Sequence, residues 1–250
     1  MNEFLNHVMS ILGIIPARGG SKSISMKNIV NLSGLPLISY TIKAALNSKI
    51  NRVIVSTDSK KISEISSKFG AEVPFLRPKK FASSSSHPNQ VIEHALNFLE
   101  KNESYVPEIV LFLQPTSPHR TSEMINKSIQ LLQNSKASSV VSVTKPDKHP
   151  FQSYVIKNGF LKAFYKNKEK KYYQRQLLPD FYNPTGAIYT FWTKTFKKYN
   201  SIYGPKPKPM IINNEILNID IDYEFDLFLS EMIFKNWSKF KKSYNHILDK

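Results

Sequence analysis

Short apolar runs and longer amphipathic stretches alternate along the first 144 residues of the chain. The run 109–113 has five apolar residues in succession, which is typical of a strand buried on both faces. Stretch 59–69 instead places its apolar residues on one helical face and ends at Gly70. This order predicts an α/β fold with a mostly parallel sheet. Strands are predicted over 11–15, 52–56, 72–75, 109–113 and 139–144, and helices over 36–47, 59–69, 88–101 and 122–134.

The pattern changes after Pro146. Asn158-Gly159, between the strand-like segments 154–157 and 160–164, favours the tight turn of a β-hairpin. Further strands are predicted over 186–191, 210–212 and 216–219, and a helix over 223–234. We therefore predict one domain with an inserted arm that meets a partner subunit. The domain comprises 10–145 and 186–237, the arm 146–185, and a peripheral Lys-rich tail 238–250.

Length and composition fit a single domain without disulfides. A chain of 250 residues can bury a full core, and this one has no cysteine and no run of 18 apolar residues. Its first ten residues lack the basic start and apolar centre of a signal peptide, and Met9 is an alternative start. These features predict a cytoplasmic protein with no membrane partner.

The net charge of +16 raises the possibility of a nucleic-acid partner. Most of the charge comes from lysines spread over many segments, as on a solvated surface, and no nucleic-acid-binding motif accompanies it. We therefore expect no nucleic-acid partner and keep a basic nucleic-acid-binding protein only as an alternative. Arginine binds phosphate and carboxylate in a bidentate manner that lysine cannot reproduce. Only five of the 35 basic residues are arginines, and each is a candidate binding residue: Arg18, Arg52, Arg77, Arg120 and Arg175.

The most informative segment is 11–28, where an apolar run leads into a basic loop with two glycines. Arg18 and Lys27 supply positive charge, while Gly19 and Gly20 let backbone N–H groups approach an oxyanion. Ligands of open α/β sheets gather beyond the carboxyl ends of the strands. The loop matches neither the dinucleotide-binding pattern nor the Walker A motif. A phosphate site and an ordinary turn therefore both remain open.

Asp220 and Asp222 directly follow the predicted strand 216–219. Residues two apart on a strand point to the same side, so these carboxylates would repel each other unless a cation lay beside them. Mg²⁺ suits one or two carboxylates combined with substrate phosphate oxygens. The alternative is that Asp222 caps the final helix, as Asp58 is expected to cap the helix after it. The six histidines show no metal-ligand spacing.

Taken together, these blocks resemble the acylneuraminate cytidylyltransferases, or CMP-sialic acid synthetases. The resemblance implies a three-layer Rossmann-like nucleotide-sugar transferase fold with a β-hairpin dimerisation arm, and hence a homodimer. The blocks keep their order and cover most of 11–230: IIPARGGSKSISMKNI (14–29), VIVSTD (53–58), AEVPFLRP (71–78), LQPTSPHRT (113–121), QRQLLP (174–179), PTGAIY (184–189) and IDIDYEFDL (219–227).

The resemblance also implies a reaction. CTP and a nine-carbon 2-keto sugar acid, such as sialic or legionaminic acid, would give the CMP-sugar and pyrophosphate with Mg²⁺ or Mn²⁺ as cofactor. The anomeric hydroxyl would attack the α-phosphate in line, and positioning and charge neutralisation would supply most of the rate. A CMP-Kdo-type enzyme or another sugar nucleotidyltransferase is the alternative, although Lys27-Asn28 and the QPTSP block argue against the Kdo type.

Site residues follow from the matching positions. The resemblance assigns catalysis to Lys27, Arg18, Asp220 and Asp222, the last two as metal ligands. It assigns nucleotide binding to Arg18, Gly19, Gly20, Ser21, Lys22, Lys27, Asn28 and Arg77. It assigns the sugar acid to Gln114, Tyr189 and, across a dimer interface, Arg175.

The chain departs from the family pattern at several positions. Gly and Pro are common where this chain has Ser23 and Ser25, and serines 83–86 fill a region that often holds an Asp. On the sugar-acid side, Gln152 lies where a Lys is common and Thr185 where Asn is common. The identity of the sugar acid is therefore left open.

Overall fold

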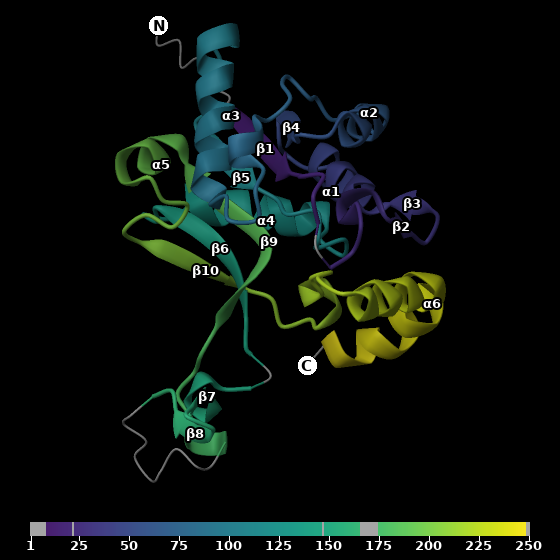
Figure 1. Cartoon of the computed structure of the whole chain (residues 1–250), viewed down its shortest axis with the longest axis vertical. Helices are drawn as coiled ribbons and strands as arrows, with labels where there is room; N and C mark the ends of the chain where they lie inside the picture. The colour runs from purple at the N-terminus through teal and green to yellow at the C-terminus, as the bar shows by residue number, and fades with distance from the viewer. Residues whose placement is uncertain (1–8, 22, 147, 166–174, 249–250) are drawn as a thin grey trace, which may run out of the picture.

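A six-stranded sheet with the order β10-β6-β9-β5-β1-β4 forms the centre of the molecule (Figure 1). The computed structural model describes residues 9–21, 23–146, 148–165 and 175–248, with side chains as far as Trp237 except that of Arg175. Neighbouring strands are parallel except at β9, which is antiparallel to β5 and β6. The predicted mostly parallel sheet is confirmed. Its strands are β1 (Ile11–Pro16), β4 (Arg52–Ser56), β5 (Ile109–Phe112), β6 (Ser139–Thr144), β9 (Asn183–Trp192) and β10 (Pro207–Ile211).

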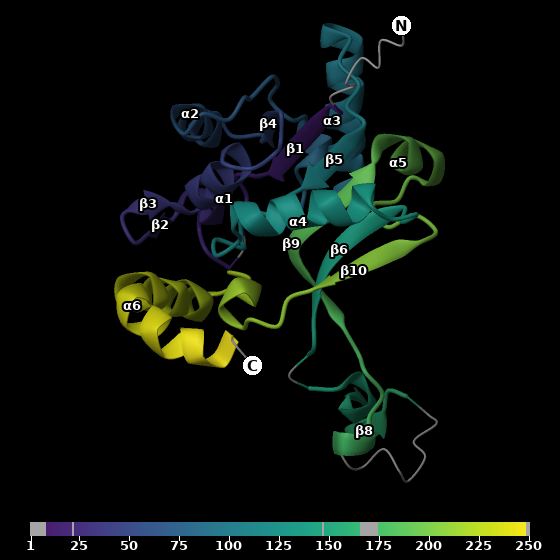
Figure 2. The ribbon, with the colours of Figure 1, turned by 180° about the vertical axis from the view of Figure 1, so that it is seen from behind.

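Helices cover both faces of this sheet, which gives the predicted three layers (Figures 1 and 2). Alternation along β1 directs Ile11 and Ile15 into one apolar cluster and Leu12 and Ile14 into the other. The first cluster is covered by α1 (Leu37–Leu46), α2 (Lys60–Lys68) and α4 (Ser122–Gln133), and the second by α3 (Pro88–Glu103) and α5 (Thr193–Tyr199).

A third apolar cluster joins the two ends of the chain. It contains Leu32 and Leu37 from the region of the small hairpin β2 (Asn31–Leu32) and β3 (Leu35–Pro36). Ile221 packs with them at no exposure, and Leu227 of α6 (Glu224–Leu248) adds to the cluster. This packing places α6 beside elements that follow β1, although nearly 200 residues separate them in sequence.

Local hydrogen bonds fix most helix ends within one or two residues of the predicted positions. The Ser59 hydroxyl accepts the N–H of Ile62 at 3.4 Å, which makes Ser59 the cap of α2. The expectation that Asp58 caps this helix is therefore wrong. Thr121 caps α4 in the same way as Ser59 caps α2.

Two predicted strands are absent from the described residues. Segment 72–75 makes one isolated bridge, between Glu72 and Ile54, because Pro74 has no N–H for a continuous ladder. Segment 216–219 forms the 3₁₀ helix η6 (Ile216–Asn218). There the Asn214 side chain accepts the N–H groups of Ile216 and Leu217, so local turn chemistry overrides the β-propensity of the isoleucines.

The final helix is longer than predicted. Its expected end near Phe234 is wrong, because no glycine or proline follows to stop it and the backbone stays helical to Leu248. Most of the Lys-rich tail 238–250 is therefore part of α6, apart from residues 249–250, which lie outside the described residues. No helix in the described part of the chain is both long and apolar enough to cross a bilayer.

The inserted arm contains the predicted hairpin, β7 (Tyr154–Lys157) and β8 (Phe160–Ala163). Asn158 and Gly159 both have positive φ, 54° and 79°, as the primed turn requires. Short helices η3 (Pro150–Gln152) and η5 (Arg175–Leu177) lie on either side of it in the sequence. Figures 1 and 2 show the arm projecting away from the sheet.

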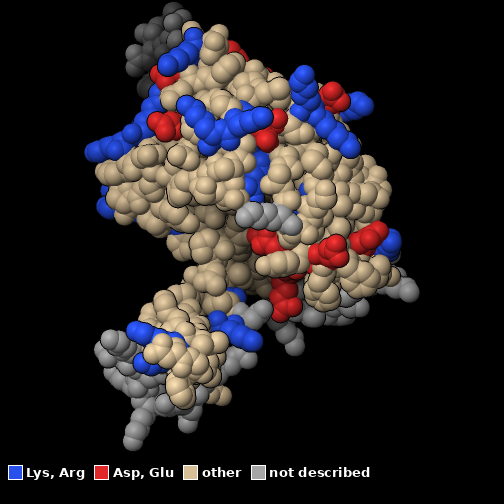
Figure 3. All heavy atoms as spheres, viewed as in Figure 1, with Lys and Arg blue, Asp and Glu red and all other residues tan. Residues whose placement is uncertain are grey.

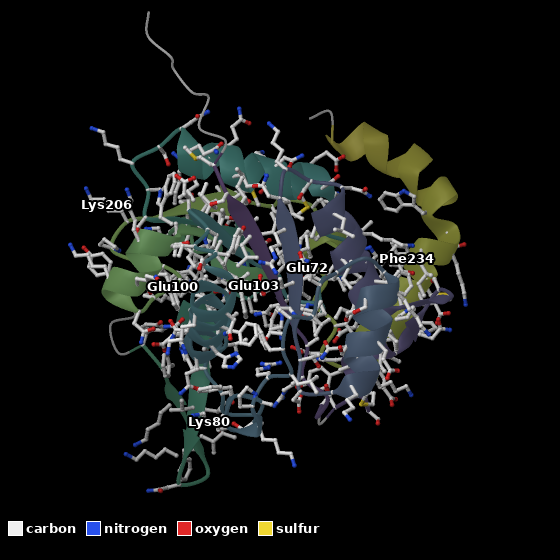
Figure 4. All side chains as sticks on the ribbon, turned by 90° about the horizontal axis from the view of Figure 1, so that it is seen from above. Glu72, Lys80, Glu100, Glu103, Lys206 and Phe234 are labelled. Atoms are coloured by element: carbon white, nitrogen blue, oxygen red, sulfur yellow. The ribbon has the colours of Figure 1, made fainter. Side chains whose placement is uncertain are left out.

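An aromatic stack attaches α6 to the body of the protein. The Phe234 ring, labelled in Figure 4, belongs to α6. It lies 4.7 Å from the Tyr40 ring on α1 and 4.7 Å from the His119 ring, with which it stacks. His119 is 9% exposed, and its Nε2 lies 3.3 Å from the hydroxyl of buried Ser230. Burial lowers the pKa of His119 from 6.5 to about 4.

This buried histidine predicts a pH-dependent stability. Between pH 4 and 6.5 the unfolded chain binds a proton at His119 and the folded chain does not, so acid favours unfolding. From about pH 7.5 to about pH 5, wild type should lose about 2 kcal/mol more unfolding free energy than His119→Phe. Urea unfolding at both pH values measures the difference. Equal losses in the two proteins would contradict the assignment.

Candidate active site

A cavity of about 520 Å³ lies at the carboxyl ends of β1 and β5. Four segments far apart in sequence contribute to it: the loop after β1, the segment before α3, the loop after β5 and the residues before α6. The basic loop and the late acidic segment therefore meet at one cavity. Polar lining residues are Arg18, Ser21, Ser23, Lys27, Asn28, Arg77, Ser83, Ser84, Ser86, Gln114, Thr116, Asp222 and Tyr223.

The loop after β1 is held by side chains from its own end and from the loop after β4. The Asn28 side chain donates to the Arg18 carbonyl at 2.9 Å. The Gly19 N–H donates to Asp58 Oδ1 at 2.8 Å, and a Cβ at Gly19 would lie 3.2 Å from Ser59 Cβ. Gly19 is therefore a glycine of close approach whose amide is bound by Asp58. In this conformation the amide is not free for a phosphate, and the assignment of Gly19 to the nucleotide stays a prediction.

Arg77 is a buried cation on the wall of the cavity, 5% exposed. Its guanidinium donates to the carbonyls of Ser56 at 2.9 Å and Phe81 at 3.3 Å. Burial lowers the pKa of Arg77 to about 10, with Asp58 opposing the shift and Arg18 adding to it. Its Nε is buried without a hydrogen-bond partner among the described residues. An acceptor group on a ligand would satisfy this donor.

Lys27 and Asp222 both line the cavity and form an ion pair, with Nζ 2.9 Å from Oδ1. Lys27 opens the short helix η1 (Lys27–Ile29) and its side chain is 14% exposed, whereas that of Asp222 is 62% exposed. In Figure 3, acidic side chains gather over α6 and the residues before it. A triphosphate and a cation entering here would exchange partners with both members of the pair.

Asp220 lies deeper than Asp222, and one of its oxygens is unsatisfied. Burial raises the pKa of the Asp220 carboxyl, and nearby Asp222 adds to this, while Thr116 and Lys27 oppose it. Oδ1 is buried with no hydrogen-bond partner among the residues described. A buried carboxylate oxygen of this kind is costly unless a cation or a donor reaches it.

The sequence predicts that the two carboxylates lie on the same side of the end of a strand. The structure differs, because the 3₁₀ helix η6 replaces that strand. Instead, the buried side chain of Ile221 anchors the turn between them, and its N–H donates to the Thr116 carbonyl at 2.8 Å. Asp220 and Asp222 still lie close enough for the charge on one to shift the pKa of the other. A cation shared by the two carboxylates therefore stays a prediction.

The donor set fits Mg²⁺ or Mn²⁺ better than a softer metal. The described residues contain no group of three or more His, Asp or Glu arranged to hold a metal ion. An ion at Asp220 and Asp222 would therefore take its remaining ligands from water and substrate phosphates. This is the coordination that Mg²⁺ commonly uses.

Sequence reasoning noted Arg120 but gave it no role. It is 3% exposed, and its guanidinium donates to the Ala187 carbonyl at 2.8 Å, to Thr41 Oγ1 at 3.1 Å and to the Gln114 carbonyl. Burial lowers the pKa of Arg120 to about 9, with Asp220 opposing the shift. It therefore connects α1, β9 and the loop after β5 behind the cavity. The rarity of arginine in this chain is the signal that identifies it.

Gly186 is a second residue that sequence reasoning did not single out. It has φ +77°, and a Cβ there would lie 3.1 Å from Gln114 Oε1 and 3.5 Å from Asp220 Oδ2. Only glycine adopts this backbone conformation readily and leaves room for both side chains. Gly186 therefore allows Gln114 and Asp220 to approach β9 at the same point.

The remaining predicted site residues lie in different parts of the chain, and not all of them are described. Gly20 belongs to the loop after β1 and has open space beside its Cα, whereas Lys22 lies outside the described residues. Tyr189 is 8% exposed in the apolar cluster under α3, where burial raises the pKa of its hydroxyl. Arg175 begins η5 in the arm, and its side chain is not among those described.

Sequence comparison matches this chain to characterised relatives. The family described as cytidylyltransferase matches residues 12–240. The CMP-N,N'-diacetyllegionaminic acid synthase of Legionella pneumophila is 34% identical over 229 residues, 90% of this chain and 96% of that protein. The pseudaminic acid cytidylyltransferase of Campylobacter jejuni is 31% identical, with 91% and 97% covered. The N-acylneuraminate cytidylyltransferase of Escherichia coli is 32% identical over 96% of this chain, which spans only 57% of that enzyme.

Solved structures of low sequence identity share the fold. CMP:2-keto-3-deoxy-manno-octonic acid synthetase, solved with CTP, superimposes with a TM-score of 0.65 at 15% identity, covering 91% of this chain and 99% of that one. The 4-diphosphocytidyl-2C-methyl-D-erythritol synthase of Anaerococcus prevotii gives 0.62 at 17%, with the same coverage. The Rossmann-like nucleotidyltransferase fold and the resemblance found in the sequence are both confirmed. On the extent of these matches, the chain belongs to the cytidylyltransferase family, and it is a nucleotidyltransferase.

Proposed function

We propose that this protein couples CTP to a nine-carbon 2-keto sugar acid, releasing pyrophosphate and forming the CMP-sugar. The observation that carries the proposal is that Arg18, Lys27, Arg77 and Asp222 all line one cavity. This combination suits a triphosphate with a divalent cation. The similar proteins from Legionella, Campylobacter and Escherichia coli are named for legionaminic, pseudaminic and N-acylneuraminic acids, which supports a nonulosonic acid as the acceptor.

The nucleotide would lie along the loop after β1. Arg18, Ser21 and Lys27 line this wall and supply the charge and donors that phosphate oxygens need. Arg77 would direct its unpartnered Nε to an acceptor of the cytidine. The amide nitrogen of Asn28 is bound to the Arg18 carbonyl, which leaves the Asn28 carbonyl oxygen for the amino group of cytosine.

The reaction forms one bond and breaks one. The anomeric hydroxyl oxygen of the sugar acid attacks the α-phosphorus and loses its proton, and the bond to the bridging oxygen of pyrophosphate breaks. Lys27 would stabilise the charge that develops on the α-phosphate. Gln114, fixed at its backbone by Arg120, would orient the sugar acid. Asp220 and Asp222 would hold Mg²⁺, which when bound neutralises the triphosphate and lowers the pKa of the attacking hydroxyl.

The proposal includes a homodimer formed through the arm and a cytoplasmic location, where nucleoside triphosphates are made. Ile156, Phe160 and Leu161 are more than 70% exposed on the hairpin. A two-stranded hairpin needs packing to be stable, and apolar side chains exposed this far mark an association surface. In such a dimer, the arm of one subunit would bring η5 and Arg175 towards the other subunit.

The dimer has a direct test. Ile156→Asp and Phe160→Asp together should place charge in the interface and convert a dimer to a monomer in sedimentation velocity. The paired change Lys68→Asp and Lys101→Asp, at exposed positions on α2 and α3, provides the control. A monomeric wild-type protein would contradict this part of the proposal.

A substrate panel tests the reaction itself. Folded protein is incubated with CTP, Mg²⁺ and, separately, N-acetylneuraminic, diacetyllegionaminic, pseudaminic and 2-keto-3-deoxy-manno-octonic acids. We expect pyrophosphate release with at least one nine-carbon acid and a product with the mass of its CMP conjugate. No release with any nine-carbon acid would overturn the proposal, and the fastest release with the eight-carbon acid would favour the Kdo-type alternative.

Removing the lysine of the cavity tests its catalytic role. Lys27→Ala should lower kcat about a hundredfold or more, as the loss of one oxyanion-stabilising group does in other enzymes. Lys68→Ala removes an exposed lysine at the end of α2 and should leave turnover unchanged. Wild-type turnover in Lys27→Ala, with an unchanged melting temperature, would exclude Lys27 from the mechanism.

A further inference from the structure

Asp226 binds the backbone of the turn that carries Asp222. Its Oδ2 accepts the N–H of Asp222 at 2.9 Å and the N–H of Tyr223 at 2.7 Å. Tyr223 immediately precedes α6, and Asp226 is the third residue of that helix. A side chain at this position that accepts the N–H of the capping residue forms one half of a capping box. The contact to Asp222 extends this arrangement one residue further, onto a residue of the cavity.

The other side of the same turn is fixed by burial. Ile221 is fully buried and its N–H donates to the carbonyl of Thr116, which also lines the cavity. Asp222 therefore lies between a buried anchor and the cap made by Asp226. Its own N–H is bound to Asp226, so the position of its exposed carboxylate depends on that side chain. Asp226 is partly buried and is thus held in place itself.

We propose that Asp226 is a positioning residue for the cation, holding Asp222 so that it and Asp220 face the same ion. This inference rests on the metal-binding role given to these carboxylates in the proposed function. It goes beyond that function because Asp226 acts through the backbone of Asp222 and not as a ligand. Residues that orient metal ligands commonly change metal affinity by about 10- to 100-fold when they are replaced.

The chain offers variants that separate the hydrogen bonds from the charge. Asp226→Ala removes both, whereas Asp226→Asn removes the charge and keeps an oxygen that can accept the two N–H groups. Glu224 is an exposed acid in the same first turn of α6, so Glu224→Gln is a matched control for charge alone.

The experiment measures Mn²⁺ binding to the protein alone, from the loss of the free Mn²⁺ signal in electron paramagnetic resonance. Asp226→Ala should weaken Mn²⁺ binding about tenfold or more. Asp226→Asn and Glu224→Gln should stay within about threefold of wild type, since they keep the hydrogen bonds. In turnover assays, Asp226→Ala should raise the half-saturating Mg²⁺ concentration while kcat recovers at saturating Mg²⁺. A merely structural defect would lower kcat at every Mg²⁺ concentration.

Several results would overturn the inference. They are wild-type Mn²⁺ binding by folded Asp226→Ala, an equal loss in Asp226→Ala and Glu224→Gln, or a tenfold loss in Asp226→Asn. If Asp226→Ala does not fold, a tenfold loss in Asp226→Asn still overturns the inference. Because Mn²⁺ binding needs no substrate, it also separates the two proposals. Failure of the substrate panel with the expected pattern of Mn²⁺ binding would overturn the reaction and leave the role of Asp226 standing.

Discussion

The contact between Lys27 and Asp222 joins residues 195 positions apart and defines the site. It lies where the loop that follows the first strand meets the turn that precedes the last helix. The contact itself contributes little stability, since Asp222 is mostly exposed and such surface ion pairs are worth about 0–1 kcal/mol. Its position is instead imposed by the buried groups on either side, above all Ile221 in the third apolar cluster.

Charge is arranged in two layers around this contact. Arg18 and Lys27 line the cavity and are partly buried. Behind them, Arg120 and Asp220 are desolvated, and the charge on Asp220 favours the charged form of Arg120. The carbonyl groups that bind Arg120 satisfy its donors, whereas one oxygen of Asp220 remains unsatisfied. This imbalance is the physical reason to expect a cation at Asp220.

Apolar patterning alone predicts the central sheet and most helices, because buried strands and amphipathic faces leave a strong periodic signal. The prediction fails where a single polar residue or proline determines the local backbone conformation. Pro74 interrupts the strand expected at 72–75, and Asn214 converts the strand expected at 216–219 into a 3₁₀ turn. Ser59, and not Asp58, caps α2, which frees Asp58 to bind the Gly19 amide.

The candidate site also combines features that the sequence predicts with features that only the structure shows. Basic residues after a strand and paired aspartates are visible in the sequence, and the structure places Lys27 and Asp222 on one cavity. The supporting residues Arg120, Gly186 and Asp226 are not visible as a group, because their roles depend on contacts between segments far apart in sequence. Gly186 becomes meaningful only once Gln114 and Asp220 are seen to converge on it.

The most direct test of this account is a crystal structure with CTP and Mn²⁺, in which anomalous scattering locates the metal. The account predicts one Mn²⁺ bound by both Asp220 and Asp222, with the triphosphate lying between the metal and the loop that carries Arg18 and Lys27. A triphosphate bound away from that loop, or Mn²⁺ that contacts neither carboxylate, would contradict it.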